Sequence, residues 1–225
     1  MYNKINWYYR NRQERSKWIA QRFSDFFIES QSFLDVGCWE KDLKKYVPSN
    51  SKYFGIDISG SPDKFINLDK IEKLPFNDKE FDLAICSDVL EHLENIHLIF
   101  DEILRVSNKY VIITLPTATH YRVLKKIITK KKYLQTEEKR KEFGKYLKFF
   151  GLPLEKPDDR HRWFFGLDEA IEFIDYRSNK SNFSLKIIDT DLNYKKGKGK
   201  LISKFLGTWN KNLAVSTVMV LLERN

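Results

Sequence analysis

The chain has 225 residues, of which 42% are hydrophobic and 15% aromatic, and this composition suits one globular domain with a sizeable core. No apolar run reaches the roughly 18 residues that a membrane-spanning helix needs. The opening residues MYNKINWYYRNRQERSKW lack the apolar stretch of a secretory signal, and two cysteines are too few for a disulfide framework, so we expect a cytoplasmic protein. The 40 Lys and Arg exceed the 31 Asp and Glu, and this formal net charge of +9 points to an anionic partner.

Along the first third of the chain, the apolar pattern predicts a helix followed by strands. An aromatic, basic helix is expected over residues 11–29, and an apolar strand at 32–36 follows it. After a short helix, further strands are expected at 53–57, 65–68 and 81–86.

The alternation continues in the remainder of the chain. A helix should begin at Ser87 and Asp88, because apolar residues then recur at three- and four-residue steps as far as residue 104. A β-branched strand is predicted at 110–115, and a helix at 121–128 follows it. Two late strands, at 184–189 and 214–222, are separated by a basic loop, which favours an antiparallel pair at the edge of the sheet.

Strands that alternate with helices indicate an α/β fold with a doubly wound, mainly parallel, seven-stranded sheet. We predict a single domain over residues 1–225, with residues 1–30 as an N-terminal helical cap. Residues 120–165 do not fit the alternation, because they become densely basic and then loop-like. Such an insertion after a strand lies where loops cover the ligand crevice, so we expect a helical lid at the acceptor side; a solvent-exposed excursion is the alternative.

Acidic residues end three successive predicted strands. Asp35 ends the strand in FLDVGC, and Gly37 follows it, where a missing side chain lets a ligand approach the backbone. Asp57 ends the strand in YFGIDIS, about 20 residues further on, where an acid can accept both ribose hydroxyls of a nucleoside cofactor. Asp69 follows the next strand. A single aspartate of this kind is usually a turn residue, but three at one sheet edge predict a cofactor site.

FLDVGC, FGIDIS, NLDKIEKLPFNDKEFDLAICSDVLEHL and YVIITLP follow one another over roughly residues 32–116. This series resembles the class I S-adenosylmethionine-dependent methyltransferases, and most of all their small-molecule branch with an LPF…FD…LEHL signature. The resemblance implies a Rossmann-like methyltransferase fold, with S-adenosylmethionine as cofactor and S-adenosylhomocysteine as product. It implies that Asp35 and Gly37 cradle the methionine end, that Asp57 binds the ribose, and that residues around Asp69 surround the adenine. The cofactor-binding residues expected on this basis are Asp35, Gly37, Cys38, Trp39, Asp57, Ile58, Leu68, Asp69, Lys70, Cys86 and Ser87.

The turn after the first strand departs from the pattern of that family, which usually has glycines two and four residues beyond Gly37. Trp39 and Lys41 stand there instead. Trp39 either closes over the cofactor or packs under the first helix. Lys41 is unfavourable beside a sulfonium unless it turns to solvent or meets the cofactor carboxylate. We expect a variant turn that still binds; a non-catalytic cofactor-binding protein is the alternative from another class.

Asp88, Glu91 and His92 have the spacing i, i+3 and i+4, which places three side chains on one face of a helix. Some methyltransferases similar to this one use an E-x-x-E-H version to bind a divalent ion. Asp88 followed by Glu91 is also a capping box at a helix start, and we favour that interpretation, so metal binding is the weaker prediction here.

A general base is needed if the methyl acceptor is a hydroxyl or a protonated amine. His161 lies in DDRHRWFFGLDEAIEF, and similar Arg/His/Trp/Phe runs occur at the acceptor side of related methyltransferases. His120 directly follows the fifth strand. We predict His161, and after it His120, as the catalytic base, while a hydrogen-bonded structural role suits either equally well. His97 lies on an apolar helix stripe and is expected to be structural.

Two segments carry the positive charge. Residues 122–148 have a net charge of +8 and residues 195–211 of +6, which leaves −5 for the remainder. In 195–211 apolar residues interleave with lysines at helical steps, as in interfacial amphipathic helices, although RNA would suit the same side chains. We predict O- or N-methylation of a small-molecule, sugar or lipid-linked acceptor that is anionic, with a peripheral membrane contact through 195–211. An RNA methyltransferase is the alternative.

Overall fold

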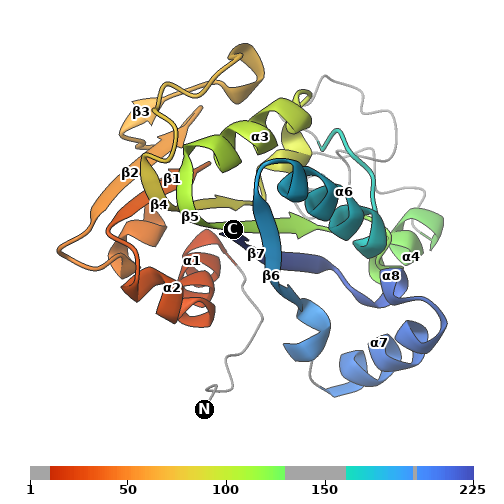
Figure 1. The fold of residues 1–225 in the computed structure, drawn as a ribbon. Coiled ribbons are helices and arrows are strands. Elements are labelled where there is room, and N and C mark those ends of the chain that lie inside the picture. Colours follow the sequence, from red (N-terminus) through yellow and green to blue (C-terminus); the bar gives the residue numbers. More distant parts are fainter. Residues whose placement is uncertain (1–10, 130–160, 195–196) are drawn as a thin grey trace.

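The computed structural model describes residues 11–129, 161–194 and 197–225. Their centre is a seven-stranded sheet in the order β3-β2-β1-β4-β5-β7-β6 (Figure 1). The strands are β1 (Ser32–Val36), β2 (Lys52–Asp57), β3 (Lys64–Phe65), β4 (Phe81–Ser87), β5 (Ser107–Pro116), β6 (Phe183–Thr190) and β7 (Thr217–Arg224). The first five are parallel, and β7 runs antiparallel to both β5 and β6. The predicted doubly wound, mainly parallel fold is confirmed.

Helices cover both faces of the sheet (Figure 1). On one face lie α1 (Arg12–Arg22) and α2 (Ser24–Ile28); Trp18 of α1 and Phe23, between the two helices, pack with Phe33 and Leu83 of the sheet. On the other face lie α3 (Ile96–Val106) and α6 (Leu167–Lys180). Because both faces are covered, the central strands are apolar throughout, as in the fully buried run Val111–Ile113 of β5.

Short helices complete the described chain. The 3-10 turns are η1 (Asp42–Tyr46), η2 (Leu68–Lys70), η3 (Leu90–His92) and η5 (Asp191–Tyr194). The remaining α-helices are α4 (Tyr121–Thr129), α7 (Gly197–Trp209) and α8 (Lys211–Ala214). No helix of the described ranges is long and apolar enough to cross a membrane.

Several predicted boundaries are wrong. The helix predicted at 11–29 is divided at Phe23, whose backbone leaves the helical region. The strand predicted at 65–68 is shorter, because Asn67 accepts a hydrogen bond from the Asp69 amide and starts η2 there. Between β6 and β7, where we predicted a basic loop, the chain forms α7 and α8; α7 agrees with the helical steps noted in 195–211, and β7 begins only at Thr217.

The predicted helix start at Ser87 and Asp88 is also wrong, and with it the capping box. Asp88 has φ +52°, a left-handed conformation, and only the 3-10 turn η3 follows before α3 begins at Ile96. The carboxylate of Asp88 accepts hydrogen bonds from Arg15 and Thr114 instead of capping a helix. The η3 turn that follows has no side-chain cap.

Much of the predicted lid lies outside the described residues. Of the segment 120–165, the structure describes α4 at its start and residues 161–165 at its end. Most of the basic run 122–148 lies outside as well.

Candidate active site

Asp35 lies near the carboxyl end of β1, between Gly55 of β2 and Ile85 of β4. Its side chain is buried and accepts a hydrogen bond of 2.7 Å from the Tyr53 hydroxyl. Burial raises the pKa of Asp35 from 3.8 to about 6, although the Tyr53 hydrogen bond opposes this. A cationic ligand group beside this carboxylate would stabilise its ionised form.

The turn after β1 depends on a glycine. Gly37 has φ +79°, and a Cβ built there would lie only 2.2 Å from Cγ2 of Val89. The amides of Gly37 and Cys38 both donate to the carbonyl of Ile56, at 2.8 and 3.1 Å, which ties the turn to the end of β2. The turn therefore brings together the ends of β1, β2 and β4.

The structure explains how the turn accommodates Trp39 and Lys41. Their φ angles are +49° and +55°, so both hold the left-handed conformation that glycine adopts most easily. The Lys41 ammonium turns away to an ion pair of 2.9 Å with Asp63. The Asp63 carboxylate, on the loop after β2, thereby balances the charge of Lys41, and the ammonium does not have to point at a cofactor sulfonium.

Asp57, at the end of β2, has hydrogen-bond acceptor positions left for a ligand. Its carboxylate accepts hydrogen bonds from the amides of Trp39, at 2.8 Å, and Ser59, at 3.0 Å. The Ser59 hydroxyl makes a third, longer contact of 3.5 Å with the same carboxylate. A carboxylate offers about four acceptor positions, so one is left, and a second becomes available when a ligand displaces the Ser59 hydroxyl. Two vicinal hydroxyls would match them.

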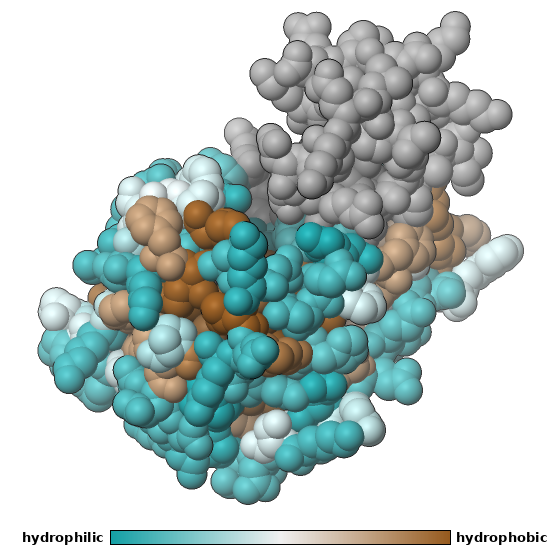
Figure 2. Space-filling model, turned by 90° about the horizontal axis from the view of Figure 1, so that it is seen from above, coloured by the Kyte–Doolittle hydropathy of each residue, from teal (hydrophilic) through white to brown (hydrophobic). Residues whose placement is uncertain are grey.

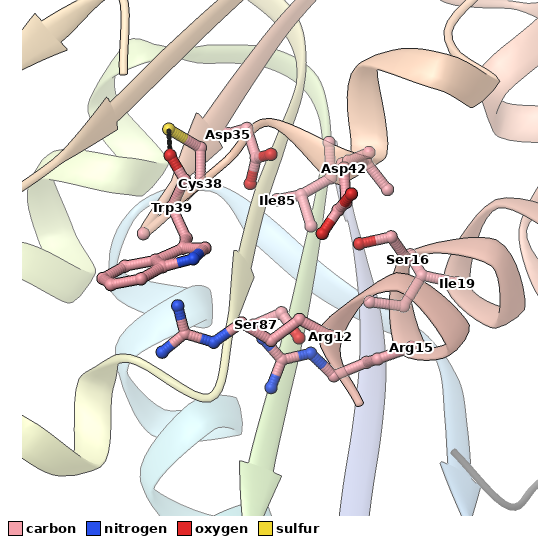
Figure 3. A pocket seen from close by; sticks show the side chains of 12 residues that line it. Arg12, Arg15, Ser16, Ile19, Asp35, Cys38, Trp39, Asp42, Ile85 and Ser87 are labelled. Carbon is pink, nitrogen blue, oxygen red and sulfur yellow. Dashed lines mark hydrogen bonds between the residues drawn. The ribbon is translucent and has the colours of Figure 1, made fainter. Parts of the chain in front are cut away.

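A pocket lies between this turn and helix α1. Trp39 borders one side of it, and Ser16 and Ile19 of α1 border the other (Figure 3). The guanidinium of Arg12 lies 4.5 Å from the centre of the Trp39 ring, a cation–π contact. Arg15 pairs with Asp88 at 2.5 Å. Neither arginine was predicted as a site residue, because only the packing of α1 brings them to the strand ends.

Asp69 stands on η2, beside the loop that precedes α3. Its carboxylate accepts a hydrogen bond of 2.9 Å from the amide of Glu94 and lies 3.6 Å from the guanidinium of Arg162. The neighbouring Leu68 is buried in the core, so its side chain anchors η2 to the hydrophobic interior.

The other predicted cofactor residues have different surroundings. Ile58 and Lys70 are exposed. The thiol of Cys86 is fully buried, and burial raises its pKa well above the ordinary value, so it is no nucleophile. The Ser87 hydroxyl bonds with that of Thr114, at 2.8 Å. Ser87 lines the pocket between the turn after β1 and helix α1.

Glu91, His92 and His161 form a cluster just beyond the end of β4. Oε1 of Glu91 lies 3.4 Å from Nε2 of His92 and 4.0 Å from Nε2 of His161. Glu91 and His161 are buried, while His92 is half-buried. No hydrogen bond reaches either carboxylate oxygen of Glu91 within the part of the chain that the structure describes. A buried carboxylate in this state is costly unless a cation or a proton donor faces it.

Backbone contacts fix His161 beside Glu91, although about 70 residues separate them. The amide of Arg162 donates to the Glu91 carbonyl, and its guanidinium donates to that of His92, both at 2.8 Å. The indole of Trp163 donates to the carbonyl of Leu93, at 2.6 Å. The end of the predicted lid segment is thus anchored on η3 and the residue that follows it.

One ligand atom each from Glu91, His92 and His161 lies within 4.8 Å of the other two, so these residues could hold a metal ion. The donor set differs from the one considered from sequence, because Asp88 turns to Arg15 and His161 takes its place. Two imidazoles and a carboxylate suit Zn²⁺ and other divalent transition metals.

The other two histidines lie apart from this cluster in the contacts that the structure records. His120 is buried, and its Nδ1 accepts a hydrogen bond from the Arg122 amide. His97 packs edge-on against Trp163 and Phe173, as expected for a structural residue.

Comparisons with known proteins agree with this architecture. Residues 34–113, from β1 into β5, match a family model described as a methyltransferase domain. A search of curated proteins finds no significant match.

Solved structures with the same fold cover nearly the whole chain. An S-adenosylmethionine-dependent methyltransferase from Archaeoglobus fulgidus is 15% identical, with a TM-score of 0.57 and 96% of both chains covered. One from Methanosarcina mazei is 16% identical, with a TM-score of 0.54, covering 90% of this chain and 96% of that one. The small RNA methyltransferase HEN1 is 14% identical, with a TM-score of 0.55, covering 95% of this chain but 25% of that one. At these identities the likeness is one of fold.

Proposed function

We propose that this chain, which belongs to the class I S-adenosylmethionine-dependent methyltransferases, methylates an oxygen or nitrogen of an anionic small-molecule, sugar or lipid-linked acceptor. The observation that carries the proposal is the buried pair of Glu91 and His161 beside the end of β4, next to the strand ends that would hold the cofactor.

The strand ends fit the cofactor by the chemistry of their donor set. Asp57 has acceptor positions left for the ribose hydroxyls, and Asp35 would face the cationic part of the methionine end. Arg12 and Arg15 line the same pocket and suit the cofactor carboxylate. When bound, S-adenosylmethionine supplies a methyl group on a positively charged sulfur, so the protein has mainly to position the acceptor and exclude water.

His161 is the base in this proposal. Its imidazole would take the proton of the acceptor, and the Glu91 carboxylate, 4.0 Å away, would stabilise the imidazolium that forms. The burial of both groups strengthens this interaction relative to water. His120 remains our second proposal for the base, supported by its position between the end of β5 and α4.

The cofactor and the acceptor class can be tested separately. Calorimetry should show micromolar binding of S-adenosylmethionine and none of NAD. The chain is then incubated with methyl-labelled cofactor and a cell extract separated into small-molecule, lipid and RNA fractions. Label in the small-molecule or lipid fraction supports the proposal, whereas label in RNA alone would establish the RNA alternative. Binding without transfer to any fraction would favour the non-catalytic alternative.

The base is tested with His161→Gln, which should lower the labelling rate by about a hundredfold or more and leave the dissociation constant of the cofactor unchanged. His97→Gln is the matched control, because His97 also contacts Trp163 but stands outside the cluster. Equal labelling by both variants would transfer the role to His120, for which His120→Gln is the corresponding variant.

A divalent metal ion is the second proposal for the acceptor half, favoured by the 4.8 Å grouping of Glu91, His92 and His161. A metal there would polarise the acceptor oxygen in place of a base. Dialysis against Zn²⁺ or Mn²⁺ followed by elemental analysis should give one ion per chain, absent from Glu91→Gln. If no ion binds, the metal proposal fails and the base proposal is unaffected.

A further inference from the structure

Helix α7 turns large apolar side chains outward. Leu201 is 71% exposed, Ile202 45%, Phe205 65% and Trp209 81%. Their spacing places them on one face of the helix, and we call these four residues the apolar stripe. The apolar face of a helix in a globular domain normally turns to the core, so a stripe of this kind marks an interaction surface.

The opposite face of α7 already packs on the protein, through small residues. Ser203 is fully buried. A Cβ built on Gly207 would lie 3.4 Å from that of Ala214 in α8, which shows how closely the two helices approach. The apolar stripe is therefore not the surface by which α7 is attached.

Positive charge accompanies the apolar stripe. Lys198, Lys200, Lys204 and Lys211 are all exposed, and residues 195–211 contain no acidic residue. Helical geometry places Lys200 and Lys204 along one flank of the stripe. Apolar side chains bordered by lysines are typical of a helix that lies in the headgroup region of an anionic membrane.

The connection between β6 and β7, which contains α7, lies at the end of the sheet where the parallel strands have their carboxyl ends, as the candidate active site does. β7 begins at Thr217, which pairs with Pro116 at the carboxyl end of β5. Asp191, at the start of the connection, accepts hydrogen bonds from the amide and hydroxyl of Ser216 at its end. In Figure 1, α7 stands beyond that end of β7, beside α8. On the face seen in Figure 2, hydrophilic side chains dominate and apolar ones gather in a few places.

We propose that the apolar stripe of α7 and its flanking lysines bind the surface of an anionic lipid membrane. Four exposed lysines without an acid suit phospholipid phosphates, and the exposed apolar stripe can enter the boundary between headgroups and acyl chains, as the apolar face of an interfacial helix does. RNA fits less well, because only Phe205 and Trp209 of the stripe could stack on a base, whereas Leu201 and Ile202 offer aliphatic surface that suits acyl chains.

The experiment is sedimentation of the full chain with vesicles of phosphatidylcholine containing one quarter phosphatidylglycerol, compared with phosphatidylcholine alone. The chain should sediment with the anionic vesicles and more weakly with the neutral ones. Phe205→Ser should weaken binding about tenfold or more. Lys200→Gln with Lys204→Gln should weaken it roughly thirtyfold.

Phe65→Ser is the matched control, because Phe65 lies on the edge strand β3, at the opposite side of the sheet from β6, and is 66% exposed, about the same as Phe205. It should bind like the unmodified chain. Failure to bind anionic vesicles, equal binding to neutral ones, or equal loss in Phe65→Ser would each overturn the proposal. So would binding of a single-stranded RNA oligonucleotide without binding of vesicles. Cofactor binding is measured on the same samples, so a failure of the membrane proposal is distinguishable from a failure of the proposed function.

Discussion

Replacing Asp57 should weaken cofactor binding by an amount that its hydrogen bonds predict. Two of about four acceptor positions on the carboxylate are taken by the amides of Trp39 and Ser59, and two are available to the ribose hydroxyls once they displace the long 3.5 Å contact from the Ser59 hydroxyl. A hydrogen bond to a charged group contributes about 1.5 kcal/mol at the low end of the usual range. Asp57→Ala should therefore lose about 3 kcal/mol, or roughly a hundredfold in affinity, and Asp57→Asn about half that free energy, or tenfold.

The measurement is titration calorimetry with S-adenosylmethionine, accompanied by thermal unfolding of each variant. Asp57→Ala also removes two anchors of the turn, so its unfolding temperature should fall. Asp82→Ala controls for this, because Asp82 accepts the amide of Gln31 and the side-chain amide of Asn108 at the other end of the sheet. A folded Asp57→Ala variant that binds the cofactor within twofold of the unmodified chain would refute the reasoning.

Three further predictions concern the strand ends. The pKa of Asp35 is about 6 in the folded chain and 3.8 in the unfolded chain, so the free energy of unfolding falls as the pH rises from about 4 to 6. Asp35→Asn cannot ionise and should avoid this loss, which is about 3 kcal/mol. Its unfolding temperature should therefore exceed that of the unmodified chain at pH 7.5 but not at pH 4. Lys41→Gly should be about 1 kcal/mol more stable than Lys41→Ala in urea unfolding, because both lose the ion pair with Asp63 but only glycine relieves φ +55°; equal stability would mean that the left-handed backbone carries no strain. Gly37→Ala should cost about 3 kcal/mol, and Val89→Ala in the same chain should recover part of it, since their contact would be 2.2 Å; additive effects in a double-mutant cycle would contradict this.

Local sequence is sufficient to identify the strands that hold the cofactor half of the site. The predicted strand 32–36 coincides with β1, and those at 53–57 and 81–86 differ from β2 and β4 by one residue. Buried parallel strands are apolar on both faces, and a polar or glycine residue marks their carboxyl ends, so the pattern is readable without a structure. Asp35 and Asp57 follow from the same pattern, because parallel strands end at one edge.

The sequence was a poor guide wherever a distant contact overrode the local preference. Asp88 has the spacing of a helix cap with Glu91, but its backbone is left-handed, its carboxylate pairs with Arg15 of α1, and only the 3-10 turn η3 follows. The helix predicted at 11–29 breaks at Phe23, because the fully buried ring packs under the sheet. Intrinsic helix propensity is a weak preference, and a buried tertiary contact can outweigh it.

By itself, the sequence determined the class of fold, the sheet and the strand-end acids, because each of these depends on residues close together in the chain. Only the tertiary structure brought His161 to Glu91 and Arg12 to Trp39, since these contacts join segments that the sequence cannot place in space. It also decided that the apolar residues of α7 face solvent, because periodicity identifies an apolar face but does not say what covers it.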